Sequence, residues 1–241
     1  MAAAVAASCG TVTRTRAGVR VWAAPPMLIT FSGLDGSGKS TLIAWLKSEL
    51  ERRHVAVTVL HVGNDVGVYA CLRYLRDAVK RIARRHPEAA GGKVPPRPHR
   101  LTRRVRNAVV WNKPLRRALY PVDLVMFLAV RFFVEHVQRR ILVTDRYFYD
   151  TLVDVADQGR WFWVRLLERL TPAPDVAVFL DVSPEESFER KREYSVPYLA
   201  LRSASYRMVA PLVPSALVLP NRDLVATRRA LQRAVWERLS A

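Results

Sequence analysis

The pattern with the clearest chemical meaning is the glycine-rich run Gly33-Leu34-Asp35-Gly36-Ser37-Gly38-Lys39-Ser40-Thr41. It fits the spacing G-x-x-x-x-G-K-[ST], follows an apolar strand-like run and opens a helical pattern, as a phosphate-binding loop requires. In such a loop backbone N–H groups wrap a phosphate, and the lysine reaches the β- and γ-phosphates. The sequence therefore predicts an ATP site, with a merely structural glycine turn as the alternative. The residues expected to hold the cofactor are Gly33, Gly36, Ser37, Gly38, Lys39, Ser40 and Thr41, with Mg²⁺ on Ser40.

A second candidate site is the pair Asp145 and Arg146 in the run Val143-Thr144-Asp145-Arg146-Tyr147. The pair ends a strand-like run, and open α/β sheets place their ligands at the carboxyl ends of strands. Asp145 is expected to hold Mg²⁺ or its water. Arg146 is expected to bridge donor and acceptor phosphates and to stabilise the charge of the transferring group. The alternative is a surface salt bridge at a strand end.

These residues need a scaffold, and the chain alternates apolar strand-like runs with helical patterns. That alternation is typical of a parallel sheet with crossover helices. Ser183-Pro184-Glu185-Glu186 has the form of a capping box with proline at the first helical position, which predicts a helix after the fourth strand. We therefore predict a three-layer α/β/α P-loop NTPase fold with about five parallel strands. The expected strands are 28–32, 55–61, 141–144, 176–181 and 216–219.

The net charge of +18 is unevenly distributed along the 241 residues. Residues 80–117 carry thirteen basic side chains against the single acid Glu88, whereas residues 1–26 carry three arginines and no acid. We expect a P-loop kinase domain over 27–241 with a basic insertion at 80–117. The insertion is either a solvated, partly disordered arm or a segment that attracts an anionic surface, acceptor or nucleic acid. The leader 1–26 is either a targeting segment or a disordered extension, or it follows from a start codon assigned too far upstream.

Cysteine content and hydropathy exclude several protein classes. Two cysteines, Cys9 and Cys71, cannot build a disulfide framework or a four-ligand zinc site. The longest apolar stretch, near 124–134, contains Arg131 and is too short for a membrane span, so no transmembrane helix is expected. We expect a cytoplasmic protein, or an organellar one if residues 1–26 form a transit peptide.

The sequence resembles the thymidylate kinases and their thymidylate-kinase-like relatives from about Met27 to Ala210. The resemblance rests on Phe-Ser-Gly-Leu-Asp-Gly-Ser-Gly-Lys-Ser-Thr at 31–41, on Asp-Arg-Tyr at 145–147 and on Pro-Asp-Val-Ala-Val-Phe-Leu-Asp-Val-Ser-Pro-Glu-Glu at 174–186. It implies an ATP- and Mg²⁺-dependent kinase that phosphorylates a small-molecule acceptor, a nucleoside monophosphate. A homodimer is a further expectation.

The resemblance assigns three residues to the acceptor. Asp35 is expected to face its sugar hydroxyl, unless it serves only as a charge at a helix N-terminus. Phe127 and Arg131, four residues apart on one helical face, are expected to read a planar base. A core phenylalanine beside a solvated arginine is the alternative for this pair.

The resemblance also implies a mobile lid at about 189–197, where Glu189-Arg190-Lys191-Arg192-Glu193 follows the fourth strand's helix. Arg190 and Arg192 are expected to close over the phosphates and exclude water, because the P-loop itself carries no arginine. A solvated helix end is the alternative.

Two stretches depart from the family pattern. Where the family carries an arginine that grips the acceptor phosphate, this chain has His61-Val62-Gly63-Asn64-Asp65, so that grip is missing or has moved to Arg73 or Arg76. After Asp-Arg-Tyr the family shows a serine and a glutamine, whereas this chain reads Phe148-Tyr149-Asp150-Thr151-Leu152-Val153-Asp154. The acceptor pocket therefore differs from that of a thymidylate kinase.

Three functions fit the pattern. The leading one is a nucleoside monophosphate kinase. A second keeps the chemistry but uses a sugar, lipid-linked or secondary-metabolite acceptor. The third is a nucleotide-dependent switch or nucleic-acid-binding ATPase, although Asn112-Lys113-Pro114-Leu115 lacks the aspartate of a GTPase Asn-Lys-x-Asp motif.

Overall fold

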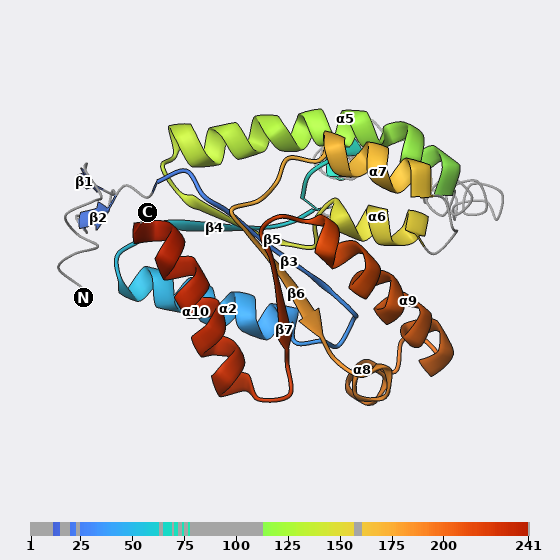
Figure 1. Ribbon diagram of the computed structural model, residues 1–241. Coiled ribbons are helices and arrows are strands. Elements are labelled where there is room, and N and C mark those ends of the chain that lie inside the picture. Colours follow the sequence, from blue (N-terminus) through green and yellow to red (C-terminus); the bar gives the residue numbers. More distant parts are fainter. Residues whose placement is uncertain are drawn as a thin grey trace, which may run out of the picture. The chain divides into compact units, whose positions relative to one another are not determined.

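The structure is a computed structural model (Figure 1) that describes residues 12–14, 20–22, 25–62, 65–68, 70–71, 74, 77, 113–156 and 161–240. The remaining residues, among them Arg73, Arg76 and 80–112, lie outside the described part of the chain. Within the leader, β1 (Val12–Arg14) and β2 (Arg20–Trp22) form an antiparallel pair in which Val12 lies opposite Trp22. The role of the leader stays a prediction.

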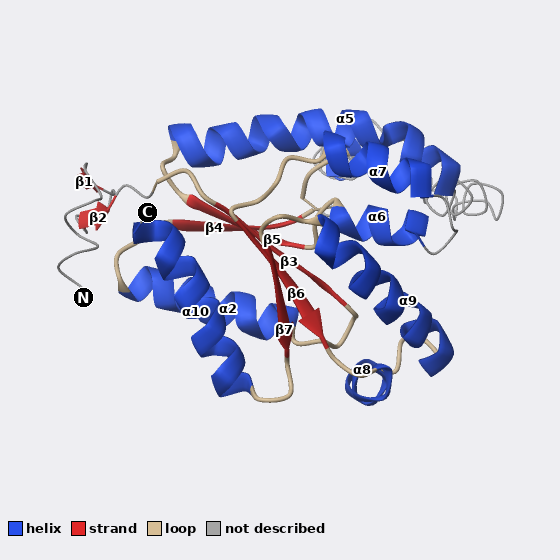
Figure 2. Cartoon of the chain, viewed as in Figure 1, coloured by secondary structure: helices blue, strands red, loops and turns tan. Residues whose placement is uncertain are grey.

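Five parallel strands form the central sheet (Figure 2), in the order β4-β5-β3-β6-β7. The predicted α/β P-loop NTPase fold is confirmed, and each expected strand agrees with an observed one to within two residues. The strands are β3 (Leu28–Gly33), β4 (Val57–His61), β5 (Ile141–Asp145), β6 (Val176–Asp181) and β7 (Ala216–Pro220). Because the order reverses at β3, the loop after β3 opens at a switch point, where open α/β sheets bind ligands.

One face of the sheet is covered by α2 (Lys39–Arg52) and α10 (Leu224–Ser240), which lie beside each other in Figure 1. The apolar side chains of α2 are buried here, together with those of α10 and of strands such as β3. They include Leu42, Ile43, Leu46 and Leu50 of α2, Leu231 and Val235 of α10, and Ile29 of β3. Each fully buried aliphatic side chain contributes about 1.5–3 kcal/mol. This core therefore fixes the start of α2 against the end of β3.

The opposite face is covered by α6 (Tyr149–Ala156) and α9 (Val196–Val209). The rings of Tyr149 and Tyr206 pack on Phe179 of β6, with centroid distances of 6.0 Å and 6.5 Å. Helix α7 (Trp161–Leu170) packs against α6, and the short helices η2 (Phe133–Val137, a π-helix) and η3 (Ala210–Leu212) follow α5 and α9. Helix α8 (Pro184–Lys191) begins at the predicted cap, where Ser183 Oγ accepts a hydrogen bond of 3.1 Å from the N–H of Glu186.

The chain divides into two compact units, residues 1–62 with 131–241 and residues 63–130. The second unit contains most of α5 (Lys113–Phe132), and within it Asp123 Oδ1 accepts a 2.8 Å hydrogen bond from the N–H of Val68. The helix, strand and pocket residues that form the candidate site below all belong to the first unit. Across the described ranges, no helix combines the length and apolar character that a membrane span needs.

Candidate functional site

The glycine-rich loop joins β3 to α2 and is built from backbone conformations that favour glycine. Gly36 and Gly38 have φ of 87° and 91°, and Gly38 caps the start of α2. A Cβ atom at Gly36 would lie 2.8 Å from the carbonyl oxygen of Ser187, and one at Gly38 would collide with the side-chain amide of Asn221. Glycine is therefore required twice here, for the positive φ and for the close approach of neighbouring segments.

Lys39 folds back into this loop. Its Nζ donates to the carbonyl oxygens of Gly33 and Leu34 at 3.0 Å and 2.7 Å, and the residue is only 7% exposed. Burial, together with the nearby charge of Arg146, lowers the pKa of Lys39 below its ordinary value. A phosphate anion in the loop would offset both effects, because it supplies the negative charge that a buried ammonium group lacks.

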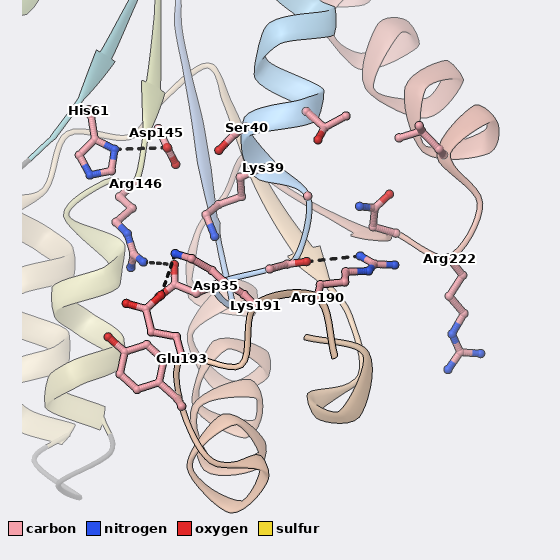
Figure 3. Close-up of a pocket in the computed structure, with 16 residues that line it drawn as sticks. Asp35, Lys39, Ser40, His61, Asp145, Arg146, Arg190, Lys191, Glu193 and Arg222 are labelled. Carbon is pink, nitrogen blue, oxygen red and sulfur yellow. Dashed lines mark hydrogen bonds and ion pairs between the residues drawn. The ribbon is translucent and has the colours of Figure 1, made fainter. Parts of the chain in front are cut away.

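A pocket of about 740 Å³ opens beside the loop at the carboxyl ends of the strands (Figure 3). Nine of the predicted site residues line it, while Gly33 and the buried Ser37 lie behind them in the loop. The lining residues are Asp35, Gly36, Gly38, Lys39, Ser40, Thr41, His61, Asp145, Arg146, Arg190, Lys191, Glu193, Tyr194, Asn221, Arg222 and Leu224.

Asp145 ends β5 and points into the pocket beside His61, whose Nδ1 lies 3.2 Å from Asp145 Oδ2. The other carboxylate oxygen, Oδ1, is buried and has no hydrogen-bond partner among the residues that the structure describes. Ser40 lines the same pocket. An unpaired carboxylate oxygen and a hydroxyl are ligands that suit Mg²⁺, which commonly takes one or two protein oxygens and completes its shell with phosphate and water. The residues present therefore fit the predicted metal.

Arg146 follows directly and has a left-handed backbone with φ of 64°. Its guanidinium group forms an ion pair with Asp35 (Figure 3) and lies 3.5 Å from Asp150. Burial alone would lower the pKa of Arg146, but the two carboxylates outweigh it and raise the pKa. The side chain therefore stays cationic at the mouth of the pocket.

Asp35 faces Arg146 and Lys39 across the loop. Burial would raise the pKa of Asp35, but the charges of Arg146 and Lys39 lower it below the ordinary value of 3.8. Asp35 is therefore an ionised acceptor, suited to a hydrogen bond from an acceptor hydroxyl group.

The predicted lid, at about 189–197, starts within the last turn of α8, and this helix contacts the loop. Arg190 donates to the carbonyl oxygen of Gly36 at 3.4 Å, and Ser187 Oγ donates to the carbonyl oxygen of Asp35. Arg192 is the C-cap residue that follows α8, and its φ is 33°. It is exposed and does not line the pocket. Of the two predicted lid arginines, the structure brings Arg190 to the site and leaves Arg192 at its edge.

The structure places the predicted base reader Arg131 elsewhere. Arg131 Nε donates to both carboxylate oxygens of Glu135, and its guanidinium group lies 3.9 Å from Asp175, just before β6 begins. That is the amino edge of the sheet, opposite the pocket. Phe127 is fully buried in the second unit, and its role stays a prediction.

Sequence reasoning did not single out the segment after β7. Asn221 Nδ2 donates to the carbonyl oxygen of Ser37 at 2.7 Å, and Asn221, Arg222 and Leu224 line the pocket. The signal was available, because this segment follows the carboxyl end of the fifth predicted strand, where the same rule that selected Asp145 predicts a ligand site.

The sequence of this chain is similar to that of a known protein. The chain is 24% identical over 165 residues to a probable thymidylate kinase of Methanosphaera stadtmanae, covering 68% of this chain and 71% of that protein. The chain is similar to a thymidylate kinase. No protein-family model matches it. This similarity and the P-loop fold support a kinase-like, nucleotide-binding enzyme.

Proposed function

We propose that the protein is an ATP- and Mg²⁺-dependent phosphotransferase that acts on a nucleoside monophosphate. The observation that carries this proposal is the arrangement of Lys39 and Arg146, two cations from different elements that face one pocket beside the glycine-rich loop. Phosphoryl transfer depends mainly on positioning and on charge stabilisation, which such a pair supplies.

Six of the lining side chains have a role in this proposed reaction. The loop N–H groups and Lys39 bind the triphosphate, and Arg146 stabilises the charge on the transferring group. Ser40 and Asp145 would hold Mg²⁺, which neutralises charge on the β- and γ-phosphates. Arg190 closes over the phosphates from the lid, and Asp35 accepts a hydrogen bond from the acceptor.

A second candidate is a kinase for a non-nucleotide acceptor, such as a sugar or a lipid-linked or secondary metabolite. What favours it is the position of Arg131, because its guanidinium group pairs with Glu135 and Asp175 at the amino edge of the sheet and does not line the pocket where a base would bind. His61 lies where the family's phosphate-gripping arginine was expected. A homodimer, an anionic partner for residues 80–117 and a cytoplasmic location remain predictions.

The experiment is a phosphoryl-transfer screen with the full chain, ATP and Mg²⁺, offering dTMP, other nucleoside monophosphates and sugars as acceptors. Lys39→Ala should lower turnover by about 10²–10³-fold, because it removes a cation aimed at the transferring phosphate. Lys47→Ala is the matched control, since Lys47 is half-exposed on the same helix, pairs with exposed Glu51 at 3.8 Å and does not line the pocket.

The outcomes separate the two candidates. Product with a nucleoside monophosphate supports the first, and product with non-nucleotide acceptors alone replaces it by the second. An absence of any product, together with an absence of ATP binding in the wild-type protein, would contradict both.

A further inference from the structure

Asp150, in the first turn of α6, is a buried acid that the proposed chemistry does not use. It is 8% exposed and does not line the pocket. Its Oδ2 accepts hydrogen bonds of 3.1 Å each from Ser32 Oγ and from the N–H of Tyr147. Its Oδ1 faces Arg146 and accepts a hydrogen bond from the hydroxyl group of Tyr206. One carboxylate therefore joins β3, the turn after β5 and α9.

The side chain of Tyr206 is also fixed by several contacts. Its ring packs on Phe179, and the guanidinium group of Arg202 lies 5.7 Å from the ring centroid while pairing with Asp154. Burial and the neighbouring Asp150 raise the pKa of Tyr206 well above its ordinary value, so the phenol keeps its proton and donates a hydrogen bond to the carboxylate. The direction of this hydrogen bond is therefore fixed.

Arg146 needs such support for two reasons. Its backbone has the left-handed conformation, which is strained for a residue other than glycine and persists only where surrounding contacts impose it. Of its two carboxylates, Asp35 lines the pocket and is open to a ligand, whereas Asp150 lies behind Arg146, outside the pocket lining. Asp150 is therefore the contact that persists when a substrate engages the pocket side.

We propose that Asp150 and Tyr206 are positioning residues: Asp150 holds the guanidinium group of Arg146 from behind, and the hydroxyl group of Tyr206 fixes the Asp150 carboxylate. The catalytic part of this inference rests on the proposed function, since it assigns Arg146 to the transferring phosphoryl group. The structural part is that Tyr206 of α9 orders the guanidinium group of Arg146 through Asp150, and it does not depend on the acceptor.

The main test is Tyr206→Phe, which removes one hydroxyl group and keeps the ring against Phe179 and Arg202. With ATP and dTMP, kcat should fall about tenfold and the KM for ATP should stay within about twofold, because Arg146 is displaced while the nucleotide loop is intact. Asp150→Asn should lower kcat further, by about 100-fold.

The matched control is Tyr147→Phe. It removes a phenol of the same neighbourhood whose hydroxyl group donates to the carbonyl oxygen of Pro172 at 2.7 Å, not to Asp150. Its kcat should equal that of the wild-type protein. Equal loss of kcat in Tyr147→Phe and Tyr206→Phe would reduce both to general structural damage and overturn the proposal.

A second readout needs no acceptor. In ¹⁵N–¹H spectra of arginine side chains, the Arg146 guanidinium signals, identified by their absence in Arg146→Lys, should shift or broaden in Tyr206→Phe and stay unchanged in Tyr147→Phe. Unchanged Arg146 signals in Tyr206→Phe overturn the proposal, and so do altered signals with an unchanged kcat. If the wild-type protein phosphorylates no acceptor, the proposed function fails while these spectra still decide whether Tyr206 orders Arg146.

Discussion

Two mostly buried arginines, Arg146 and Arg131, each face two carboxylates at opposite edges of the same sheet. Arg146 follows β5 at the carboxyl edge and contacts Asp35 and Asp150. Arg131 ends α5 at the amino edge, where Asp175 also accepts a 2.7 Å hydrogen bond from the N–H of Leu28, the first residue of β3. In charge and burial the two clusters are alike.

The two clusters differ in whether a carboxylate lines the pocket together with its arginine. Asp35 lines the pocket, so a ligand can reach it together with Arg146. Glu135, by contrast, is 2% exposed and binds Arg131 through both oxygens, at 2.9 Å and 3.1 Å. The side chain of Asp175 is also exposed, at 41%, but it does not line the pocket. What separates the two clusters is therefore that Asp35 and Arg146 line one pocket, whereas the Arg131 cluster joins secondary-structure elements.

The largest expected effect separates the two arginines by activity. Arg146→Ala should lower kcat by about 10³-fold, since the proposed reaction then loses the cation that stabilises the charge on the transferring group. Arg131→Ala should leave kcat within about twofold, because its side chain lies at the other edge. Steady-state kinetics with the acceptor found in the screen measures both, and a large loss of kcat in Arg131→Ala would break the contrast.

The second prediction concerns the contribution of Arg131 to the stability of the folded protein. Arg131→Ala should lower the free energy of unfolding by about 3 kcal/mol, because it leaves Glu135 buried without its counter-charge. Urea denaturation followed by circular dichroism measures this. The double variant Arg131→Ala with Glu135→Leu should recover most of the loss, since the uncompensated charge is then removed. An unfolding midpoint that Arg131→Ala leaves unchanged would show that Glu135 needs no partner.

The sequence predicted the elements whose signals are local. The strands were located to within two residues because strands of a parallel sheet that are covered on both faces read as continuous apolar runs. The glycine-rich loop was located because the spacing of its glycines and lysine follows directly from the backbone conformation that a phosphate-binding loop needs. Lys39, Asp145 and Arg146 then fell at one edge, since the carboxyl ends of parallel strands share it.

The sequence did not settle contacts that depend on packing across long separations. Arg131 has Phe127 four residues before it and Glu135 four residues after it, and both spacings place neighbours on one helical face. The decisive contact is with Asp175, and it depends on where the helix ends relative to β6. The link between Tyr206 and Asp150 spans 56 residues and was likewise not visible in any local pattern.

The third prediction tests Asp145 as the proposed metal ligand at the carboxyl edge. Asp145→Asn should raise the Mg²⁺ concentration needed for half-maximal binding of a fluorescent ATP analogue by about tenfold, because an amide oxygen replaces a charged ligand. Asp175→Asn makes the same chemical change at the amino edge and should leave the Mg²⁺ titration unaltered. Equal shifts in both variants would mean that the effect is general electrostatics rather than ligation.

The smallest expected effect concerns the ionisation of Asp35. Because Arg146 and Lys39 hold the pKa of Asp35 below 3.8, its carboxylate stabilises the folded protein above that ordinary value. The contribution is lost as the pH falls through the lower, folded-state pKa, where the group binds a proton in both states. The difference in unfolding free energy between the wild-type protein and Asp35→Asn should therefore shrink from about pH 5 to about pH 2. In an Arg146→Ala background the same comparison should be flatter, since the cation that lowers this pKa most is gone, whereas an Arg131→Ala background should leave the slope as it is. A wild-type difference that stays constant across this range would mean that Asp35 gains nothing from facing Arg146, and the two arginines would then no longer differ in the way that the pocket suggests.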